Sequence, residues 1–434
     1  MKLSIRTATL STSLLLSSLV SFALAADNET PGDVVVPPQT ASSEALNLSS
    51  QAATLRLAGL DFYPHAAGTA LYDDNLLISH TNRVAVTELT LSPGLTVAGG
   101  DVAAVLPGSV TLGQLRSLLD NSLADDGSKP QRFIAIEYTP DLNEFVDHAH
   151  FNNVDDFAGL IAGYALSRLT LRLDQDFKSE AVKDNLVGER VTIREYDTRI
   201  RLRYELTDRT YVEMNERYVN FEYEDQIFQG YQEFRNDDWL NRNFGDKLSA
   251  GLGAAIGSVI PDATANQTYE QALGRAAYRI SGKVNLSAEG GVDVREYDQA
   301  NQQTIHPTFN MSGLYQPWAT TTFSLNAYGR EEPSPSAEQN YTVYGLSAGG
   351  RQLIFSRFHT DVNAGYNSVN FAASSSGGGD TRTDGFYFAR VRLDYDLNPH
   401  WTASVFYTRN QNDSTASEFS YNNNIFGARV TWQY

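Results

Sequence analysis

The final stretch of the chain alternates between apolar or small side chains and polar ones. From Phe426 to Tyr434 every second residue is aromatic, aliphatic or alanine, and the residues between them are polar or glycine. A period of two is typical of a β-strand whose two faces meet different surroundings. A strand that ends on an aromatic residue suits a closed barrel, in which the last strand pairs with the first and leaves no free edge. The alternative is the last strand of a soluble sandwich.

The same alternation recurs in the interior of the chain. It is clear at 169–178, 199–206 and 387–397, where apolar residues alternate mostly with arginine and acidic residues. In a soluble sandwich the polar face would meet water, whereas in a membrane barrel it would line the lumen and the apolar face would meet lipid. The repetition of strands of about 10 to 15 residues, longer than most globular strands, favours the barrel.

Short turns and longer polar segments alternate between these strands. Thr207-Asp208, Ser281-Gly282 and Asn398-Pro399 are examples of the turns, and Glu180–Arg190 is one of the segments expected to be irregular. Short turns at one end and longer loops at the other are the asymmetry of outer-membrane barrels. The pattern predicts an all-β fold, a single transmembrane antiparallel up-and-down barrel of about 16 to 18 strands that starts near Asp61, with both termini periplasmic.

The N-terminal residues predict an exported protein. Residues 1–25 combine a basic start, a short apolar core and an Ala23-Leu24-Ala25 cleavage site, which is the pattern of a secretory signal peptide. The apolar core is too short to span a bilayer comfortably as an anchor. Residues 26–60 are rich in proline, serine and acidic residues and are expected to form a flexible periplasmic segment. Residues 61–434 would then form the outer-membrane barrel.

One long insertion interrupts the strand pattern between the second and third predicted strands. Within 98–130, five leucines fall near helical spacing, so Thr111–Ala124 is predicted to be a helix. By the parity of the strands this insertion would lie on the periplasmic side. The helix would either plug the lumen or dock on the rim of the barrel.

Composition and charge narrow the classes of function. The formal net charge is −19, and removal of a signal peptide that carries Lys2 and Arg6 makes it more negative. Such an excess argues against nucleic acid and anionic membrane surfaces as partners, and it suits a polar interior that favours cations. The chain has no cysteine, which excludes disulfides and thiolate chemistry.

Several stretches together resemble porin family 2, a family of β-barrel porins of Gram-negative outer membranes. They are Tyr63-Pro64-His65 followed by 72–77, then 91–95, the turns at 204–210 and 395–401, and the end of the chain from Tyr421 to Tyr434. The resemblance covers Leu60 to the C-terminus and implies an outer-membrane barrel, some members being associated with exopolysaccharide export. It implies no catalytic residues, and the insertion at 98–130 departs from the family pattern.

Charged residues on the polar faces are the candidate functional residues. Opposite charges in facing rows would set a transverse field in a pore and bias which solutes pass. The alternative is that they only neutralise each other in a polar interior. The predicted lumen charges are Arg199, Arg201, Arg203, Arg390, Arg392, Asp174, Asp176, Asp394 and Asp396.

Other polar clusters have weaker patterns. Arg194-Glu195-Tyr196-Asp197 recurs as Arg295-Glu296-Tyr297-Asp298, either as a solute-recruiting mouth or as similar rim chemistry at equivalent barrel positions. His148 and His150 form a weak metal candidate that lacks a third ligand. Asp73-Asp74-Asn75 is rich in oxygen but has no EF-hand spacing. No histidine lies in a G-x-S-x-G or H-E-x-x-H context, so no enzyme is expected.

These features predict a porin-like channel for small polar solutes or saccharides, without a metal or other cofactor. It would be located in the outer membrane of a Gram-negative bacterium after Sec-dependent export. The expected partners are outer-membrane lipid, the passing solute and the barrel assembly machinery, but no nucleic acid. That machinery would read the apolar row Phe426, Val430, Trp432 and Tyr434. The alternatives are a plugged structural or adhesive barrel, a component of exopolysaccharide export and, with least support, a membrane-embedded hydrolase.

Overall fold

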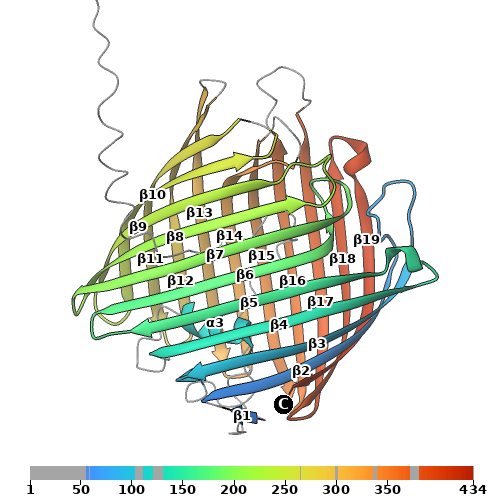
Figure 1. The fold of residues 1–434 in the computed structure, drawn as a ribbon, viewed down its shortest axis with the longest axis horizontal. Helices are drawn as coiled ribbons and strands as arrows, with labels where there is room; N and C mark the ends of the chain where they lie inside the picture. Colours follow the sequence, from blue (N-terminus) through green and yellow to red (C-terminus); the bar gives the residue numbers. More distant parts are fainter. Residues whose placement is uncertain are drawn as a thin grey trace, which may run out of the picture.

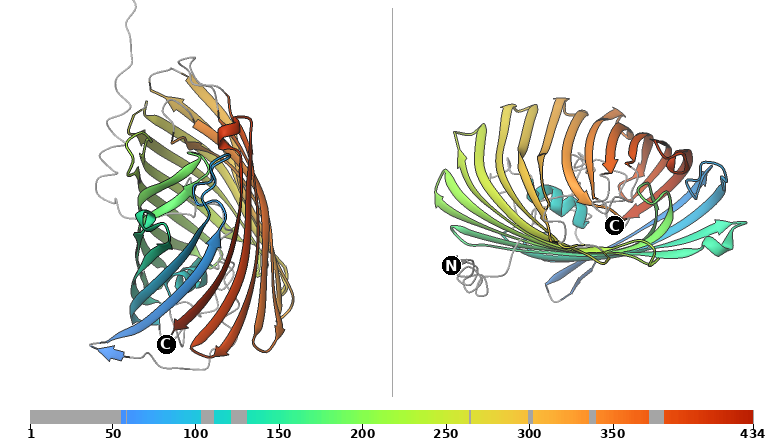
Figure 2. Two further views of the ribbon diagram at one scale, coloured as in Figure 1. Left: turned by 90° about the vertical axis from the view of Figure 1, so that its right-hand side faces the viewer. Right: turned by 90° about the horizontal axis from the view of Figure 1, so that it is seen from above.

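Alternating side chains form long strands that close into one antiparallel barrel in the computed structural model (Figures 1 and 2). The structure describes residues 55–57, 59–102, 111–120, 131–263, 265–298, 302–335, 340–371 and 381–433. The wall consists of β2 to β19, which pair in sequence order, so the predicted barrel is confirmed at 18 strands. A short extra strand, β1 (Leu55–Leu57), pairs with the start of β2.

The strands of the wall are 13 to 19 residues long. About 9 to 11 residues suffice for a tilted strand to cross a bilayer, so each strand extends beyond that length. The strands are β2 (Leu60–Asp73), β3 (Val86–Gly100), β4 (Arg132–Val146), β5 (Asn153–Ala165), β6 (Leu169–Asp184), β7 (Glu189–Thr207), β8 (Thr210–Tyr223), β9 (Tyr231–Asn243), β10 (Leu248–Pro261), β11 (Gln267–Ser281), β12 (Val284–Tyr297), β13 (Gln302–Trp318), β14 (Thr321–Pro333), β15 (Asn340–Phe355), β16 (Phe358–Phe371), β17 (Thr383–Asn398), β18 (Trp401–Ser414) and β19 (Tyr421–Gln433).

The barrel closes between its first and last wall strands. β19 runs antiparallel to β2, with Ile425 opposite Asp73 at one end of the ladder and Gln433 opposite His65 at the other. The prediction that the stretch before the C-terminus is the closing strand is therefore confirmed. Phe426 and Val430 lie on its exposed apolar face. Tyr434 lies outside the described residues, and the role of this face as an assembly signal stays a prediction.

Short turns join the strands at one end of the barrel. Asp208-Arg209 joins β7 to β8, and Pro399-His400 joins β17 to β18. At the other end of the barrel, the prediction that Glu180–Arg190 is irregular is wrong. β6 continues to Asp184 and β7 begins at Glu189, because these polar residues find cross-strand partners in each other. The β6–β7 hairpin is therefore longer than the pattern of polarity predicted.

The outer face of the wall is apolar, and the inner face carries the charges. Leu252 is 75% exposed and Leu325 is 54% exposed, whereas Asp197 is 2% exposed and Arg295 is 4% exposed. A water-soluble protein buries its large apolar side chains and exposes its charges. The reversed distribution is the pattern of a barrel with lipid outside and a polar interior.

A nine-residue helix, α3 (Leu112–Asp120), lies inside the barrel near the end that carries the short turns (Figure 2). Leu112 and Leu115 are buried against Ala135 of β4 and Ile161 of β5. Their burial attaches one face of the helix to the inner wall. Within the described ranges, no helix is long and apolar enough to cross a membrane.

The insertion is shorter than its predicted limits of 98–130. β3 continues to Gly100, because its last residues pair with the start of β2, and β4 begins at Arg132. Residues 103–110 and 121–130 lie outside the described residues, as do the predicted signal peptide and most of the N-terminal segment. The periplasmic location of the insertion stays a prediction.

A pair of neighbouring positions on β14 tests which face meets lipid. Leu325 is exposed on the outer face, and Asn326 is half-buried on the inner face. We expect Leu325→Arg to lower the free energy of unfolding by about 2–4 kcal/mol, the cost of arginine near the middle of a bilayer. Asn326→Arg is the matched control and should cost much less. Urea titration of protein folded in lipid vesicles measures both, and equal losses would contradict the assigned faces.

Candidate functional site

The nine predicted lumen charges lie on inward faces of three strands. Arg199, Arg201 and Arg203 alternate on β7 with residues of the outer face, and Asp174 lies opposite Arg199 on β6. The residues of β17 follow the same order, with Leu393 exposed and the neighbouring Asp394 buried. The alternation read from the sequence therefore places these side chains on the inner face of the wall, in one group on β6 and β7 and another on β17. Their effect on passing solutes stays a prediction.

Opposite charges on the inner wall lie in direct contact. Asp197 Oδ2 is 2.7 Å from Arg199 Nη2 and 2.8 Å from Arg217 Nη2. On β17, Arg392 Nη2 lies 3.0 Å from Asp394 Oδ2. A buried charge is stabilised by such a partner, because the interior lacks the water that would otherwise solvate it. The charges of the inner wall therefore form ion pairs with neighbouring side chains.

Polar contacts fix the helix α3 within the barrel. Arg116 Nη2 lies 2.6 Å from Asp176 Oδ1, and Arg116 Nε lies 3.4 Å from Asp174 Oδ1. The backbone N–H of Leu112 donates to Glu137 Oε2 at 2.7 Å. A carboxylate at this position satisfies one of the free N–H groups at the start of a helix and complements its dipole. Two of the predicted lumen acids therefore hold the helix.

At the opposite end of the barrel the β6–β7 hairpin crosses the lumen. Strands β6 and β2 are separated by three others, so within the wall they would lie about 19 Å apart. Lys183 of β6 nevertheless forms an ion pair with Asp73 of β2 and also bonds to Asn423 of β19. The tip residue Leu186 is 7% exposed. Its side chain packs with residues of the far wall, Tyr341 and Val343 of β15 and Val369 and Phe371 of β16.

The β14–β15 hairpin also bends over the inner wall. The ladder between β13 and β14 ends at Phe309 opposite Gly329, although β14 continues to Pro333. Beyond that point Arg295 Nη2 of β12 donates to the backbone oxygen of Glu331 at 3.3 Å. Gln267 Nε2 of β11 donates to Asn340 Oδ1 of β15 at 2.9 Å. Contacts that pass over β13 require the end of the hairpin to lie inside the barrel.

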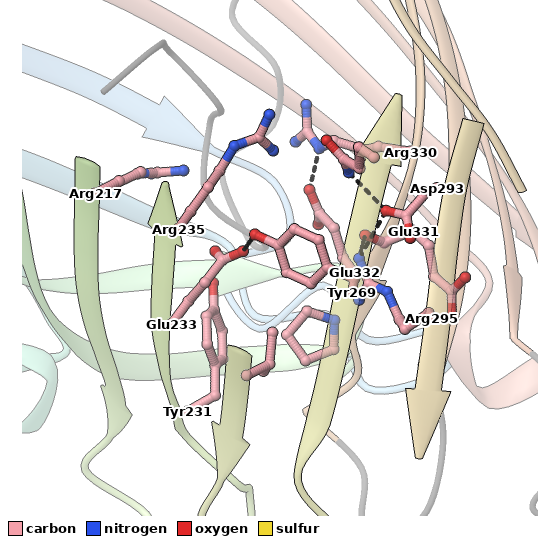
Figure 3. A pocket seen from close by; sticks show the side chains of 13 residues that line it. Arg217, Tyr231, Glu233, Arg235, Tyr269, Asp293, Arg295, Arg330, Glu331 and Glu332 are labelled. Carbon is pink, nitrogen blue, oxygen red and sulfur yellow. Dashed lines mark hydrogen bonds and ion pairs between the residues drawn. The ribbon is translucent and has the colours of Figure 1, made fainter. Parts of the chain in front are cut away.

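A polar hollow lies between this bent end and the inner face of β8 to β12 (Figure 3). Figure 3 shows Arg217 and Arg235 on one side, Arg330 and Asp293 on the other, and the ring of Tyr269 between them. We call this hollow the arginine pocket. It is lined by Arg217, Tyr231, Glu233, Arg235, Val259, Tyr269, Gln271, Asp293, Arg295, Arg330, Glu331, Glu332 and Pro333.

The residues of the arginine pocket are not marked as one site by the sequence pattern. Its residues come from six strands, and the contribution of β14 depends on where that strand leaves its neighbour. The sequence does show inward charges on single strands, such as Arg235 followed by Asp237. The pattern does not show which strands bring such charges together.

The repeated Arg-Glu-Tyr-Asp segment does not occupy equivalent positions. On β7, Arg194 is exposed and Asp197 is buried, whereas on β12 Arg295 is buried. The two copies therefore present opposite faces, since a shift of one residue turns every side chain of a strand around. The interpretation as equivalent rim chemistry is wrong for this reason.

The contacts of the two weaker polar candidates, residues 73–75 and the pair His148 and His150, do not indicate a metal site. Asp73 is paired with Lys183, and Asn424 Nδ2 donates to Asp74 Oδ2 at 2.7 Å. The ring centres of His148 and His150 are 6.0 Å apart in the β4–β5 connection. Among the described residues, no group of three or more His, Cys, Asp or Glu side chains is placed to hold a metal ion.

Comparisons with known proteins found similarity only to solved structures. No family model matches the sequence, and no curated protein matches it. Membership of porin family 2 therefore stays a prediction.

Among the solved structures is the outer-membrane protein OpdK of Pseudomonas aeruginosa, with 11% identity and a TM-score of 0.43 over 86% of this chain and 99% of that one. The outer-membrane channel DcaP of Acinetobacter baumannii has 10% identity and a TM-score of 0.44 over 88% of this chain and 100% of that one. OccAB3 of the same organism has 9% identity and a TM-score of 0.45 over 86% of this chain and 100% of that one.

Charge reversal at Arg116 tests how α3 is held. Arg116→Glu replaces two ion pairs with repulsion from Asp174 and Asp176, so we expect faster hydrogen exchange of the backbone amides in 112–120. The double variant Arg116→Glu/Asp176→Arg restores one opposite-charge pair and should recover part of the protection. Mass spectrometry of exchanged peptides measures this, and unchanged exchange in Arg116→Glu would show that the apolar contacts of Leu112 and Leu115 suffice.

Proposed function

We propose that this protein is an outer-membrane channel for small polar solutes. The observation that supports the proposal most directly is the reversed wall, with large apolar side chains exposed outside and charges buried inside. A closed wall of this kind satisfies its backbone in lipid and encloses a polar interior. A barrel of 16 to 18 strands is wide enough to hold an aqueous lumen.

Elements inside the barrel set the width of the proposed path. The helix α3 would narrow it at one end, and the β6–β7 and β14–β15 hairpins would narrow it at the other (Figure 2). Such a path suits solutes of modest size that exchange water for polar wall groups. Under this proposal the end with short turns and α3 is periplasmic, as in other outer-membrane barrels.

The same three elements favour one alternative function, a structural barrel whose lumen is blocked. Single-channel recording with purified protein in planar lipid bilayers separates the two. Stepwise ion currents are expected for the channel. A bilayer without ion current would overturn the proposal in favour of the blocked barrel, provided that heat-modifiable electrophoretic mobility shows the protein to be folded.

A substitution at the tip of the β6–β7 hairpin tests whether it restricts the path. Leu186→Asp places a charge among Tyr341, Val343, Val369 and Phe371, so we expect the tip to leave the far wall. The single-channel conductance should then rise. Leu186→Met keeps the apolar volume and should leave conductance unchanged. Removal of Thr111–Ala124 is the corresponding test for the helix. Conductance that does not change in either opened variant would show that the restriction lies elsewhere.

The predicted lumen arginines can be tested by ion selectivity. Arg199→Glu/Arg201→Glu/Arg203→Glu should shift the reversal potential toward cation preference. One charge about 8 Å from a passing ion in water contributes about 0.5 kcal/mol, which is about a two-fold change in local ion concentration. The triple change at the exposed turn residues Arg168, Arg209 and Arg357 has the same net charge and should shift selectivity less. Equal shifts in the two variants would contradict a specific role for the β7 row.

A further inference from the structure

Two acidic side chains interrupt the apolar outer face of the neighbouring strands β8 and β9 (Figure 1). Glu216 and Asp238 are exposed, whereas the residues beside them in sequence, such as Arg217 and Asp237, are buried on the inner side. Because side chains alternate along a strand, both carboxyls face outward. Between them lies Asn236, which is opposite Glu216 in the ladder and two positions before Asp238. We call Glu216, Asn236 and Asp238 the outer polar patch.

The outer polar patch lies between two levels of exposed aromatic side chains. Phe234 precedes Asn236 on β9, and the centre of its ring is 4.6 Å from that of Tyr218 on β8. Phe244 follows ten residues later, beside the turn that joins β9 to β10. Exposed aromatic residues mark the two interfaces of an outer-membrane barrel, and about 9 to 11 residues of a tilted strand cross the hydrocarbon between them. Asn236 and Asp238 therefore lie at hydrocarbon depth.

Within the described part of the chain, neither carboxyl of the patch has an arginine or lysine partner. The charged groups that act on Glu216 and Asp238 are other acids, Asp238 and Asp237 respectively. Asn236 is the hydrogen-bonding side chain beside both carboxyls, and its Nδ2 also lies 3.4 Å from the backbone oxygen of Asn215. Each carboxyl accepts several hydrogen bonds, so one amide does not satisfy both. In hydrocarbon no water supplies the rest, and the patch is costly against lipid.

A second copy of this chain supplies the missing groups at the right depth. Two copies inserted in the same direction hold equivalent residues at the same depth in the membrane. On the other side of the barrel, the outward positions at this depth are apolar: Leu325 and Ala327 on β14, Ala389, Val391 and Leu393 on β17, and Ala428 and Val430 on β19. Those strands offer the patch no polar side chain, whereas the same patch of a second copy does.

From these observations we propose that the outer polar patch is the centre of a twofold-symmetric dimer of the barrel. A twofold axis along the membrane normal places the patch of one copy against the patch of the other. The Asn236 amide of one copy then donates to a carboxyl of the other, and a carboxyl that carries a proton donates to a carboxyl across the interface. Polar side chains join transmembrane segments by hydrogen bonds of this kind. The inference goes beyond the proposed channel, because it depends on the outer face alone.

Single-cysteine cross-linking tests the dimer, since the chain has no cysteine of its own. Met214 and Leu240 are exposed on the outer face beside the patch, and Met214 is directly opposite Asp238. Met214→Cys and Leu240→Cys proteins, each produced in a Gram-negative outer membrane, should form homodimers with a short bifunctional maleimide. Val391→Cys is the matched control, exposed on the outer face of β17, and should remain monomeric. Denaturing electrophoresis and mass spectrometry measure the products.

Two further variants, each made in the Met214→Cys protein, test the polar groups. Glu216→Leu/Asn236→Leu/Asp238→Leu should lower the yield of dimer about ten-fold, because it removes the hydrogen bonds of both copies. The same variant should not lower the free energy of unfolding of the monomer in lipid vesicles, since apolar side chains suit the lipid-facing surface. Glu216→Gln/Asp238→Asn keeps groups that donate and accept, and it should retain the dimer.

The proposal is overturned if neither cysteine beside the patch gives a dimer, or if Val391→Cys cross-links equally. It is also overturned if the leucine variant, folded by its heat-modifiable mobility, cross-links as before, or if the amide variant loses the dimer. A trimer, or a product that contains another protein, would assign the patch to a different partner and overturn the dimer. Ion currents in planar bilayers test the channel and not this interface, so the two proposals can fail separately.

Discussion

The pairing of β19 with β2 supplies partners for backbone groups that an open sheet would leave free along two edges. In lipid no water replaces those partners, and each unsatisfied group costs several kcal/mol. Closure also separates two environments, because alternate side chains must then point into the lumen or away from it. The apolar outer face and the buried charges both depend on this one constraint, and so does the enclosed space that α3 and the two hairpins occupy.

Unequal ladder lengths shape that space. Strands β6 and β7 pair with each other beyond the point at which β5 stops pairing with β6, and β14 continues past its last contact with β13. Freed from one neighbour, each hairpin end bends inward and buries polar residues that require partners. Lys183 finds Asp73, and Arg295 finds the backbone of Glu331. The width of the proposed path and the arginine pocket are therefore products of the same geometry.

The strand pattern was predictable because it depends on neighbouring residues. Alternation located the closing strand, the turn at Asn398-Pro399 and the inward side of Arg199, Arg201 and Arg203. Polarity misled at Glu180–Arg190, where charged residues continue the hairpin because each finds a cross-strand partner. The repeated Arg-Glu-Tyr-Asp segment misled for another reason, since identical letters can begin on either face of a strand. The arginine pocket lay beyond such reasoning, because β14 contributes to it only after leaving β13.

Residue order alone thus specifies the long strands, their two faces and the positions of the short turns, because each follows from a period of two and from local turn chemistry. The folded barrel decides which inward side chains meet. Lys183 and Asp73 are separated by 110 residues, and Gln267 and Asn340 by 73. Their contacts require the wall to close and the hairpin ends to leave their neighbours. The local periodicity of the sequence does not predict either closure of the wall or the departure of the hairpin ends, since both depend on where each ladder of paired strands stops.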